Sequence, residues 1–193
     1  MSGENQPANF SVPQSGFSLP VPFPDSYWIL PRLFLAGEYP GSLDEKKTLN
    51  KLEALARAGI RRIVDLTEAG ESRYSLVPLR PYDHLLSQIN PIVAWTRFSI
   101  PDRGTIQKES IKVLLDHIDL QLARGIPVYL HCWGGHGRTG LVAGCWLARH
   151  GYGTGEEVFS LLSRLRRKMP DGWKPSPETA AQKEIVRSWE KGQ

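Results

Sequence analysis

The sequence is poor in cysteine, with only two among 193 residues, which is too few for the disulfide framework that stabilises small secreted domains. It also contains no apolar run of the length needed to cross a bilayer. Its first 31 residues carry neither Lys nor Arg, so the basic start of a secretory signal peptide is missing. We therefore expect a reducing, cytoplasmic environment and no membrane-spanning segment.

A strong excess of charge of one sign is missing as well. The chain has 24 Lys and Arg against 20 Asp and Glu, a formal net charge of +4. This mild excess favours anionic partners, such as phosphoesters, nucleic acid or acidic lipid, without choosing among them. The densest basic run, at 164–168, lies near the end of a predicted helix, and we interpret it as a solvated helix face. No feature singles out nucleic acid, and we expect none as a partner.

The composition is that of an ordinary globular chain, with 40% hydrophobic and 23% charged residues. Its length suits one compact domain, which we expect to be a monomer. Residues 1–24 are rich in Pro, Ser, Gly and Asn and show no periodicity. We therefore predict a flexible N-terminal arm over 1–24, followed by a single domain over 25–193.

Strand-like and helical patterns alternate along that domain. Strands are predicted at 33–35, 60–66, 96–100 and 127–131. Helices are predicted at 42–59, 83–89, 107–123, 138–150, 154–168 and 177–190. Ser42 is the expected N-cap of the first helix, and Ser176 that of the last, with Pro177 in its first position. The alternation predicts an α/β fold with a central, mainly parallel sheet flanked by helices.

One Gly-rich segment carries most of the chemistry, and it lies between the predicted strand at 127–131 and the helix that follows. At the start of a helix, backbone N–H groups and the helix dipole favour an anion. Glycines allow such a loop to curl with its amides facing inward. The segment reads His131-Cys132-Trp133-Gly134-Gly135-His136-Gly137-Arg138-Thr139-Gly140. We predict a phosphate-binding loop whose anion contacts come from Trp133, Gly134, Gly135, His136, Gly137 and Arg138.

Cys132 and Arg138 frame this loop. The field at the helix start stabilises a thiolate, so we predict that Cys132 is the nucleophile. Arg138 presents a planar fork that suits two phosphoryl oxygens. We expect the Thr139 hydroxyl to hydrogen-bond the sulfur and stabilise it as a leaving group. His131 is expected to support the loop backbone rather than to act as a base.

Two simpler interpretations explain less. An inert cysteine in a tight turn would need neither the arginine nor a place at the C-terminal edge of a strand, where open α/β sheets bind ligands. A metal site at His131, Cys132 and His136 fits no common zinc spacing, and Arg138 would repel a cation, so we expect no metal and no cofactor. The second cysteine, Cys145, is expected to be buried and structural, because disulfide geometry disfavours its reaching Cys132.

The segment from Cys132 to Arg138 resembles the signature of the protein tyrosine phosphatase superfamily. His131 before it and Thr139-Gly140 after it match the same signature. The likeness is closest to small dual-specificity and related bacterial or archaeal phosphatases, and by element order it extends over about 28–190. It implies the cysteine-phosphatase fold and a two-step hydrolysis of phosphomonoesters through a cysteinyl-phosphate.

The resemblance also implies a general acid on a loop upstream of the signature. The turn at 101–104 matches that loop, and its Asp102, thirty residues before Cys132, would protonate the leaving oxygen. Taken alone, this segment would be a plain turn. Gln182, in the last predicted helix, resembles the glutamine that some members use to place the hydrolytic water.

Several side chains are expected at the mouth of the pocket. Tensin-type lipid phosphatases, which this stretch resembles in its spacing, carry a lysine at the position of His136, where it meets extra phosphates on the inositol ring. A protonated His136 would do the same, and the alternative is that it only fills space beside Trp133. Arg73, Arg80 and Arg103 come from loops that would rim the pocket, unless they are simply exposed.

The substrate class stays open on the sequence alone. We favour phosphotyrosine, phosphoserine and phosphothreonine in proteins, because the sequence shows no tyrosine-gripping loop of the larger tyrosine-specific enzymes. A phosphoinositide or inositol phosphate is the runner-up. Other classes of function are an inactive domain that captures phosphopeptides and a sulfur-transferring or arsenate-reducing enzyme. The intact Cys132, Arg138 and Asp102 argue against the first of these, and the Pro-Asp turn argues against the second.

Overall fold

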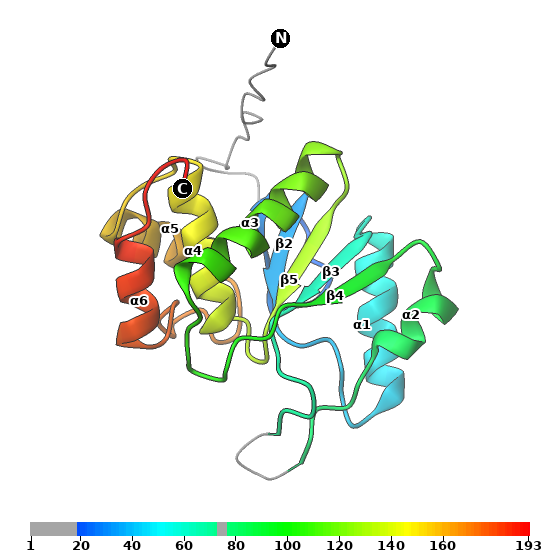
Figure 1. Ribbon diagram of the computed structural model, residues 1–193. Coiled ribbons are helices and arrows are strands. Elements are labelled where there is room, and N and C mark those ends of the chain that lie inside the picture. The colour runs from blue at the N-terminus through cyan, green and yellow to red at the C-terminus, as the bar shows by residue number, and fades with distance from the viewer. Residues whose placement is uncertain (1–18, 73–76) are drawn as a thin grey trace.

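The chain folds around one five-stranded sheet, shown in Figure 1. The computed structural model describes residues 19–72 and 77–193. The strands lie in the order β1-β2-β5-β3-β4; the β1–β2 pair is antiparallel and the other three pairs are parallel. Their bounds are β1 (Ser26–Leu30), β2 (Phe34–Gly37), β3 (Arg62–Asp65), β4 (Ala94–Arg97) and β5 (Val128–His131). The predicted α/β fold with a mainly parallel sheet is confirmed.

Helices cover both faces of this sheet (Figure 1). α1 and α2 pack on one face through a core that includes Leu35, Ile63 and Tyr129, while α3 to α6 pack on the other, where Val64 and Leu130 lie. Neighbouring residues of a strand point to opposite faces, so strands buried on both sides read as continuous apolar runs. The bounds are α1 (Glu45–Arg57), α2 (Asp83–Ile89), α3 (Lys108–Ala123), α4 (Arg138–Arg149), α5 (Glu156–Arg166) and α6 (Ala180–Arg187).

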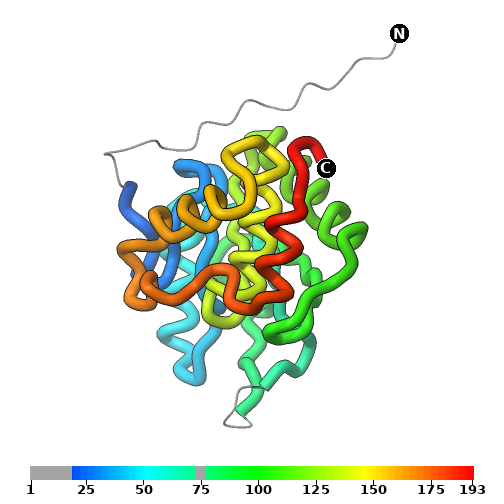
Figure 2. Tube along the Cα trace, turned by 90° about the vertical axis from the view of Figure 1, so that its left-hand side faces the viewer, coloured from blue at the N-terminus to red at the C-terminus, as the bar shows by residue number. Residues whose placement is uncertain are grey.

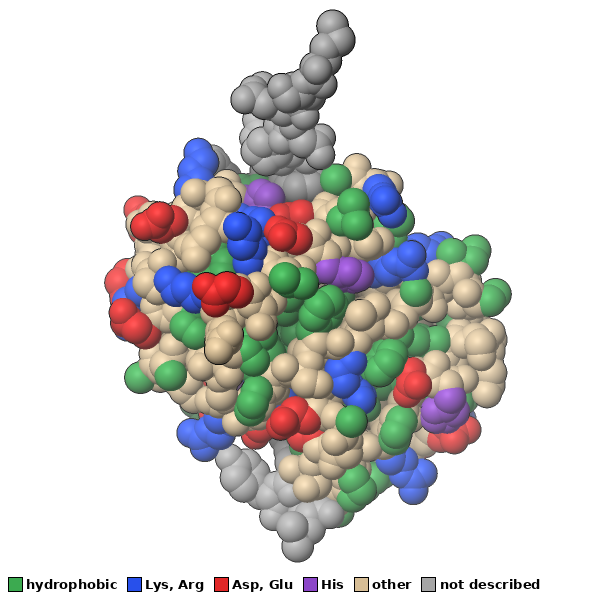
Figure 3. Space-filling view, in the orientation of Figure 1, with side chains coloured by type: hydrophobic (Ala, Val, Ile, Leu, Met, Phe, Trp, Pro, Cys, Tyr) green, Lys and Arg blue, Asp and Glu red, His purple; other side chains and the backbone are tan. Residues whose placement is uncertain are grey.

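The surface carries both signs of charge. On the face shown in Figure 3, Lys and Arg side chains are interspersed with Asp and Glu. This mixture agrees with the small formal net charge of +4. In the part of the chain that the structure describes, no helix has the length and apolar content that a membrane span requires.

The predicted boundary between arm and domain falls inside packed structure. Phe23 is 8% exposed, and its ring packs edge-on against that of Tyr129 with centroids 6.0 Å apart. The carbonyl of Pro20 accepts a hydrogen bond of 3.1 Å from the indole of Trp28. The domain therefore begins before residue 25. Residues 1–18 of the predicted arm lie outside the described residues.

The last helix starts later than predicted. It begins at Ala180 rather than at Pro177, and its N-cap is Thr179 rather than Ser176. Thr179 and Gln182 form a reciprocal capping box that satisfies two backbone donors at the helix start. This pair outweighs the Ser-Pro signal three residues earlier, where the peptide bond is cis.

Two other sequence interpretations need correction. The N-cap of α1 is Asp44, whose carboxylate accepts a 3.0 Å hydrogen bond from the Lys46 amide, and not Ser42. The basic run at 164–168 is not entirely a solvated face, because Arg166 is fully buried. Its guanidinium turns back into the protein instead of toward solvent.

The sheet topology brings two loops to one edge. β3 and β5 are parallel neighbours, so the segments that follow them leave from the same edge of the sheet, the usual ligand-binding edge of such folds. The loop after β5 packs tightly on the end of β2. Gly135 has a φ of +71°, and a Cβ there would lie 2.5 Å from the backbone of Gly37, so this position requires glycine.

Candidate active site

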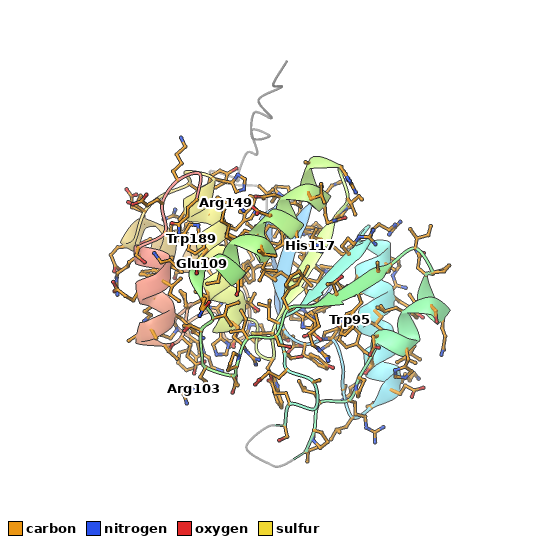
Figure 4. All side chains as sticks on the ribbon, viewed as in Figure 1. Trp95, Arg103, Glu109, His117, Arg149 and Trp189 are labelled. Carbon is orange, nitrogen blue, oxygen red and sulfur yellow. The ribbon has the colours of Figure 1, made fainter. Side chains whose placement is uncertain are left out.

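A pocket of about 470 Å³ opens at this edge of the sheet. Cys132, Arg138 and Asp102 all line it, although Asp102 belongs to the loop before α3 and the other two frame the loop after β5. Figure 4 labels Arg103, the neighbour of Asp102, at the lower left of the molecule. The structure therefore brings together the three residues from which the sequence predicts catalysis. Cys132 itself is 3% exposed.

The residues between the cysteine and the arginine are arranged unevenly around the pocket. Trp133, Gly134, His136 and Gly137 line it. Gly135 does not; it turns toward the backbone of β2. The loop thus has an open side that faces the pocket and a closed side that is fixed to the sheet.

Arg138 is almost completely buried, at 1% exposure. Its Nη1 donates to Glu71 Oε2 at 2.6 Å and to the Ile100 carbonyl at 3.0 Å. Its Nη2 donates to Glu71 Oε1 at 2.7 Å and to Asp102 Oδ1 at 3.0 Å. Burial alone would lower the pKa of Arg138, but the hydrogen bonds that it donates to Glu71 and the nearby negative charges together outweigh burial, so the pKa lies above its usual range. The arginine is therefore a fixed cation.

Glu71 is a site residue that the sequence analysis missed. Its side chain is 6% exposed, and both carboxylate oxygens bind Arg138 in a two-pronged arrangement. It follows β3, whose carboxyl end lies beside that of β5. A carboxylate shortly after a buried strand could have indicated a site residue. Glu68 shares this position, however, and nothing in the local sequence distinguishes Glu71 from it.

Replacing Glu71 with glutamine should lower kcat/KM by about 10- to 100-fold, because the carboxylate that pairs with Arg138 becomes a neutral amide whose nitrogen faces a guanidinium donor. Glu68→Gln is the matched control, since Glu68 is exposed and its side chain does not contact Arg138. The measurement is steady-state kinetics with para-nitrophenyl phosphate, together with the affinity for inorganic phosphate. Equal behaviour of the two variants would show that Glu71 does not position the arginine.

His131 lies behind the loop and is fully buried. Its Nδ1 lies 3.1 Å from the Cys132 carbonyl, and its Nε2 lies 2.5 Å from the Tyr82 hydroxyl. A carbonyl can only accept, so Nδ1 carries the proton and Nε2 accepts from Tyr82. Burial lowers the pKa of His131, which keeps the ring neutral. The imidazole therefore contacts the backbone of the nucleophile and does not line the pocket.

Gln182 is fully buried and does not line the pocket either. Its Oε1 accepts from the backbone amides of Glu178 and Thr179, both at 3.1 Å, and its Nε2 donates to the Gly104 carbonyl at 2.9 Å. Both ends of the amide are thus engaged, one in the helix cap and one in the loop that carries Asp102. These contacts give no support to the predicted placement of a water molecule by Gln182, which stays a prediction.

The structure also places two further residues that the sequence analysis discusses, Thr139 and Cys145. The Thr139 hydroxyl is buried and has no hydrogen-bond partner among the described residues, so the expected bond to the Cys132 sulfur is not formed in this structure. Cys145 is fully buried in α4, and burial raises the pKa of its thiol well above the usual range. The expected burial of Cys145 is confirmed, and its thiol is free.

His136 lies at the pocket mouth between two carboxylates. Its Nδ1 lies 3.1 Å from the Gly134 carbonyl and 3.5 Å from Asp171 Oδ2, and its Nε2 lies 3.8 Å from Glu178 Oε2. Glu178 also pairs with Arg103 at 3.6 Å and lines the pocket. Neither carboxylate was foreseen from the sequence. Carboxylates therefore lie near both nitrogens of the His136 ring, and one of them also pairs with an arginine of the pocket.

The arginines expected at the rim have different positions. Arg103 lines the pocket, Arg80 is exposed and does not line it, and Arg73 lies outside the described residues. Lys174, which the sequence analysis did not single out, lines the pocket instead. Over residues 19–72 and 77–193, no group of three or more His, Cys, Asp or Glu side chains is arranged to hold a metal ion.

Comparison with known families gives a match over most of the chain. Residues 25–186 match the family described as "PTP-SAK: Swiss Army Knife protein, DSP-PTPase phosphatase domain". A curated relative, "Putative tyrosine phosphatase 067L" of Invertebrate iridescent virus 3, is 35% identical over 106 residues. That alignment covers 51% of this chain and 38% of the viral protein, so the chain spans well under two thirds of this relative.

Solved structures share the fold. Tk-PTP in its active form has a TM-score of 0.63 at 24% identity, over 87% of this chain and 97% of that one. PTPMT1 in complex with PI(5)P has a TM-score of 0.60 at 17% identity, over 82% of this chain and 90% of that one. At such identities the similarity establishes the architecture and leaves the substrate open.

Proposed function

The chain belongs to the PTP-SAK family of dual-specificity-type phosphatase domains, and from this premise we propose that it is an active, cysteine-dependent phosphomonoester hydrolase. The observation that carries the proposal is the convergence of Cys132, Arg138 and Asp102 on one pocket from separate loops. A binding module would need the arginine and the loop amides, but it would not need a buried thiol and a carboxylic acid on the same pocket.

In the first step, the Cys132 sulfur attacks phosphorus, a sulfur–phosphorus bond forms, and the bond to the leaving oxygen breaks. Asp102 gives its proton to that oxygen, because an alkoxide or phenoxide leaves poorly without one. The loop amides and Arg138 hold the equatorial oxygens as charge redistributes. Thr139 would stabilise the sulfur when it leaves.

In the second step, a water molecule attacks the cysteinyl-phosphate and passes a proton to Asp102. The sulfur–phosphorus bond breaks, inorganic phosphate leaves and the thiolate is regenerated. Gln182 is proposed to hold the Asp102 loop through Gly104 and thereby to help place the attacking water beside Asp102. His131 is proposed to fix the orientation of the Cys132 carbonyl, and thereby of the loop.

For the substrate, we propose phosphorylated proteins, with phosphotyrosine and phosphoserine or phosphothreonine both accepted. The supporting observation is the mixed charge of the mouth, where Glu178 and Asp171 engage His136, the side chain that was expected to meet extra phosphates. Carboxylates at this place repel additional phosphates. A phosphoinositide or inositol phosphate is the second candidate. We also propose that the enzyme is a monomer and acts in the cytoplasm.

The direct test is hydrolysis of para-nitrophenyl phosphate in the presence of a thiol reductant and a chelator. The proposed function predicts turnover that does not need a metal and that orthovanadate inhibits. Absence of turnover, with phosphopeptide binding retained, would support a binding module. Turnover only after metal addition would reject the cysteine mechanism.

Glu178→Gln should shift the substrate preference toward polyanions. The Coulomb energy between the Glu178 carboxylate and a substrate grows with substrate charge, at about 1 kcal/mol per unit charge at close range in water. We therefore expect kcat/KM for an inositol polyphosphate to rise about fivefold more than that for a phosphotyrosine peptide. The measurement compares both substrates at low and high salt.

Glu53 of α1, whose side chain is 47% exposed, supplies the control variant Glu53→Gln for this experiment. High salt should shrink the difference between substrates, because exposed charges are screened. An equal change for both substrates at every salt concentration would show that Glu178 does not discriminate by charge.

A further inference from the structure

Trp173 is the most exposed large hydrophobic side chain in the described part of the chain. It is 80% exposed, whereas Trp146 and Trp189 are buried in the core. A large aromatic surface left in water is unusual for a residue whose burial elsewhere is strongly favourable. Tryptophan is also one of the residue types enriched among the residues that dominate protein–protein binding energy.

The loop that carries Trp173 is rigidly held. Arg166, fully buried at the end of α5, donates from Nη1 to the Lys174 carbonyl at 2.7 Å and from Nη2 to the Asp171 carbonyl at 3.4 Å. A Cβ on Gly172 would lie 2.2 Å from the Arg166 carbonyl, so the turn packs directly against the helix. A buried arginine is thus used to fix the backbone on both sides of an exposed tryptophan.

This loop lies at the active-site mouth. Lys174 lines the pocket, and its ammonium group lies 5.8 Å from the centroid of the Trp173 ring. On the other side, Asp171 contacts His136 of the phosphate loop. Figure 2 shows the segment between α5 and α6 crossing in front of α4, and the Ser176 hydroxyl donates to the His136 carbonyl at 2.8 Å.

These observations point to the substrate beyond its phosphate. We propose that Trp173 is a recognition platform for a protein substrate, on which a large apolar side chain close in sequence to the phosphorylated residue packs. This inference rests on the proposed phosphatase function, and it names the part of the substrate that the enzyme recognises besides the phosphate. A small phosphomonoester fills only the pocket, whereas a polypeptide continues across the rim.

A protein partner fits the charges better than an anionic membrane does. A lipid-binding rim combines an exposed tryptophan with an excess of Lys and Arg. Here Lys174 and Arg103 at the rim are balanced by Asp171 and Glu178, which pair with them at 3.5 and 3.6 Å. An apolar side chain on a polypeptide can use the aromatic surface without requiring net positive charge.

The test uses a phosphotyrosine peptide with alanine at every other position, and four variants with leucine at position −2, −1, +1 or +2. We expect the wild-type protein to prefer at least one leucine peptide over the parent by about 10- to 30-fold in kcat/KM. Trp173→Ala should abolish that preference and leave kcat/KM for para-nitrophenyl phosphate unchanged, and Trp173→Phe should retain part of it.

Ile92→Ala is the matched control, because Ile92 is 68% exposed and precedes β4, at the opposite edge of the sheet from the pocket. It should keep the full preference.

The inference would be overturned if the wild-type protein showed no peptide preference, or if Trp173→Ala lost activity equally on all substrates. Hydrolysis of para-nitrophenyl phosphate by the wild type would still support the proposed function in either case. Loss of that hydrolysis in the wild type would reject both. Wild-type binding to phosphatidylcholine–phosphatidylserine vesicles that disappears in Trp173→Ala would assign the platform to lipid and also overturn it.

Discussion

Replacing Cys132 with serine should abolish turnover of every phosphomonoester while phosphate binding survives. A serine hydroxyl needs a base to become a nucleophile, and Asp102 cannot supply one in the first step, in which it is the proton donor. His131 is buried behind the loop, with its Nε2 hydrogen-bonded to Tyr82 and its Nδ1 to the Cys132 carbonyl. The loop amides and Arg138 are unaffected by the change, so the anion site remains. Steady-state kinetics and titration with inorganic phosphate measure the two properties separately.

Cys145→Ala provides the control for this experiment. Cys145 is the other cysteine, is fully buried in α4 and has a thiol whose pKa burial raises, so it should contribute packing and no chemistry. Its replacement should retain full activity at a small cost in stability. Residual turnover in Cys132→Ser, or a loss of turnover in Cys145→Ala alone, would contradict the assignment of the nucleophile.

The phosphate loop could be predicted because its information is local. The glycines, the cysteine and the arginine lie within seven consecutive residues, between a strand and a helix that the apolar pattern already marks. Their geometry follows from the backbone alone: a Gly-rich turn at a helix start presents its amides to an anion. The mainly parallel arrangement of the sheet followed from the same alternation of strands and helices.

The partners of the loop could not be predicted, because they come from distant parts of the chain. Glu71 lies 67 residues from Arg138 in sequence, and Tyr82 lies 49 residues from His131. Glu71 lies in the segment after β3, where residues 66–71 belong to no helix or strand that would place their side chains. Which of its carboxylates meets the guanidinium depends on the tertiary path of that segment, and a single sequence does not reveal this path.

Arg166 was misread for a different reason. The sequence interpretation grouped Arg166 with its basic neighbours and placed it on a solvated face. Its spacing along the helix indicates a buried position instead. It follows Val158 and Leu162 at intervals of four residues, and both of these are fully buried. Residues four apart share one helix face, so the periodicity placed Arg166 on the buried side. The fully buried position is tolerated because its guanidinium bonds backbone carbonyls of the loop that carries Trp173.

Replacing Asp102 with alanine should separate chemistry from binding. As general acid, the carboxyl group contributes roughly 10²- to 10⁴-fold to the rate, so kcat for alkyl and phenyl phosphates should fall by about that factor. The loss should shrink for leaving groups that are already strong acids, and the decline of kcat at high pH should flatten. In this structure Asp102 Oδ1 accepts a hydrogen bond of 3.0 Å from Arg138 Nη2.

The contact between Asp102 and Arg138 also predicts how this substitution changes phosphate binding. A phosphoryl oxygen that binds the arginine fork must share or replace the position that Asp102 now takes on Nη2. Removing the carboxylate also removes a negative charge from the pocket, so inorganic phosphate should bind at least as tightly to Asp102→Ala as to the wild type. Asp102→Asn is the matched variant, because it keeps the size of the side chain without the acidic proton. A fall in kcat that is the same for all leaving groups, or an unchanged pH profile, would move the general acid to Glu178, the other carboxylate that lines the pocket among the described residues.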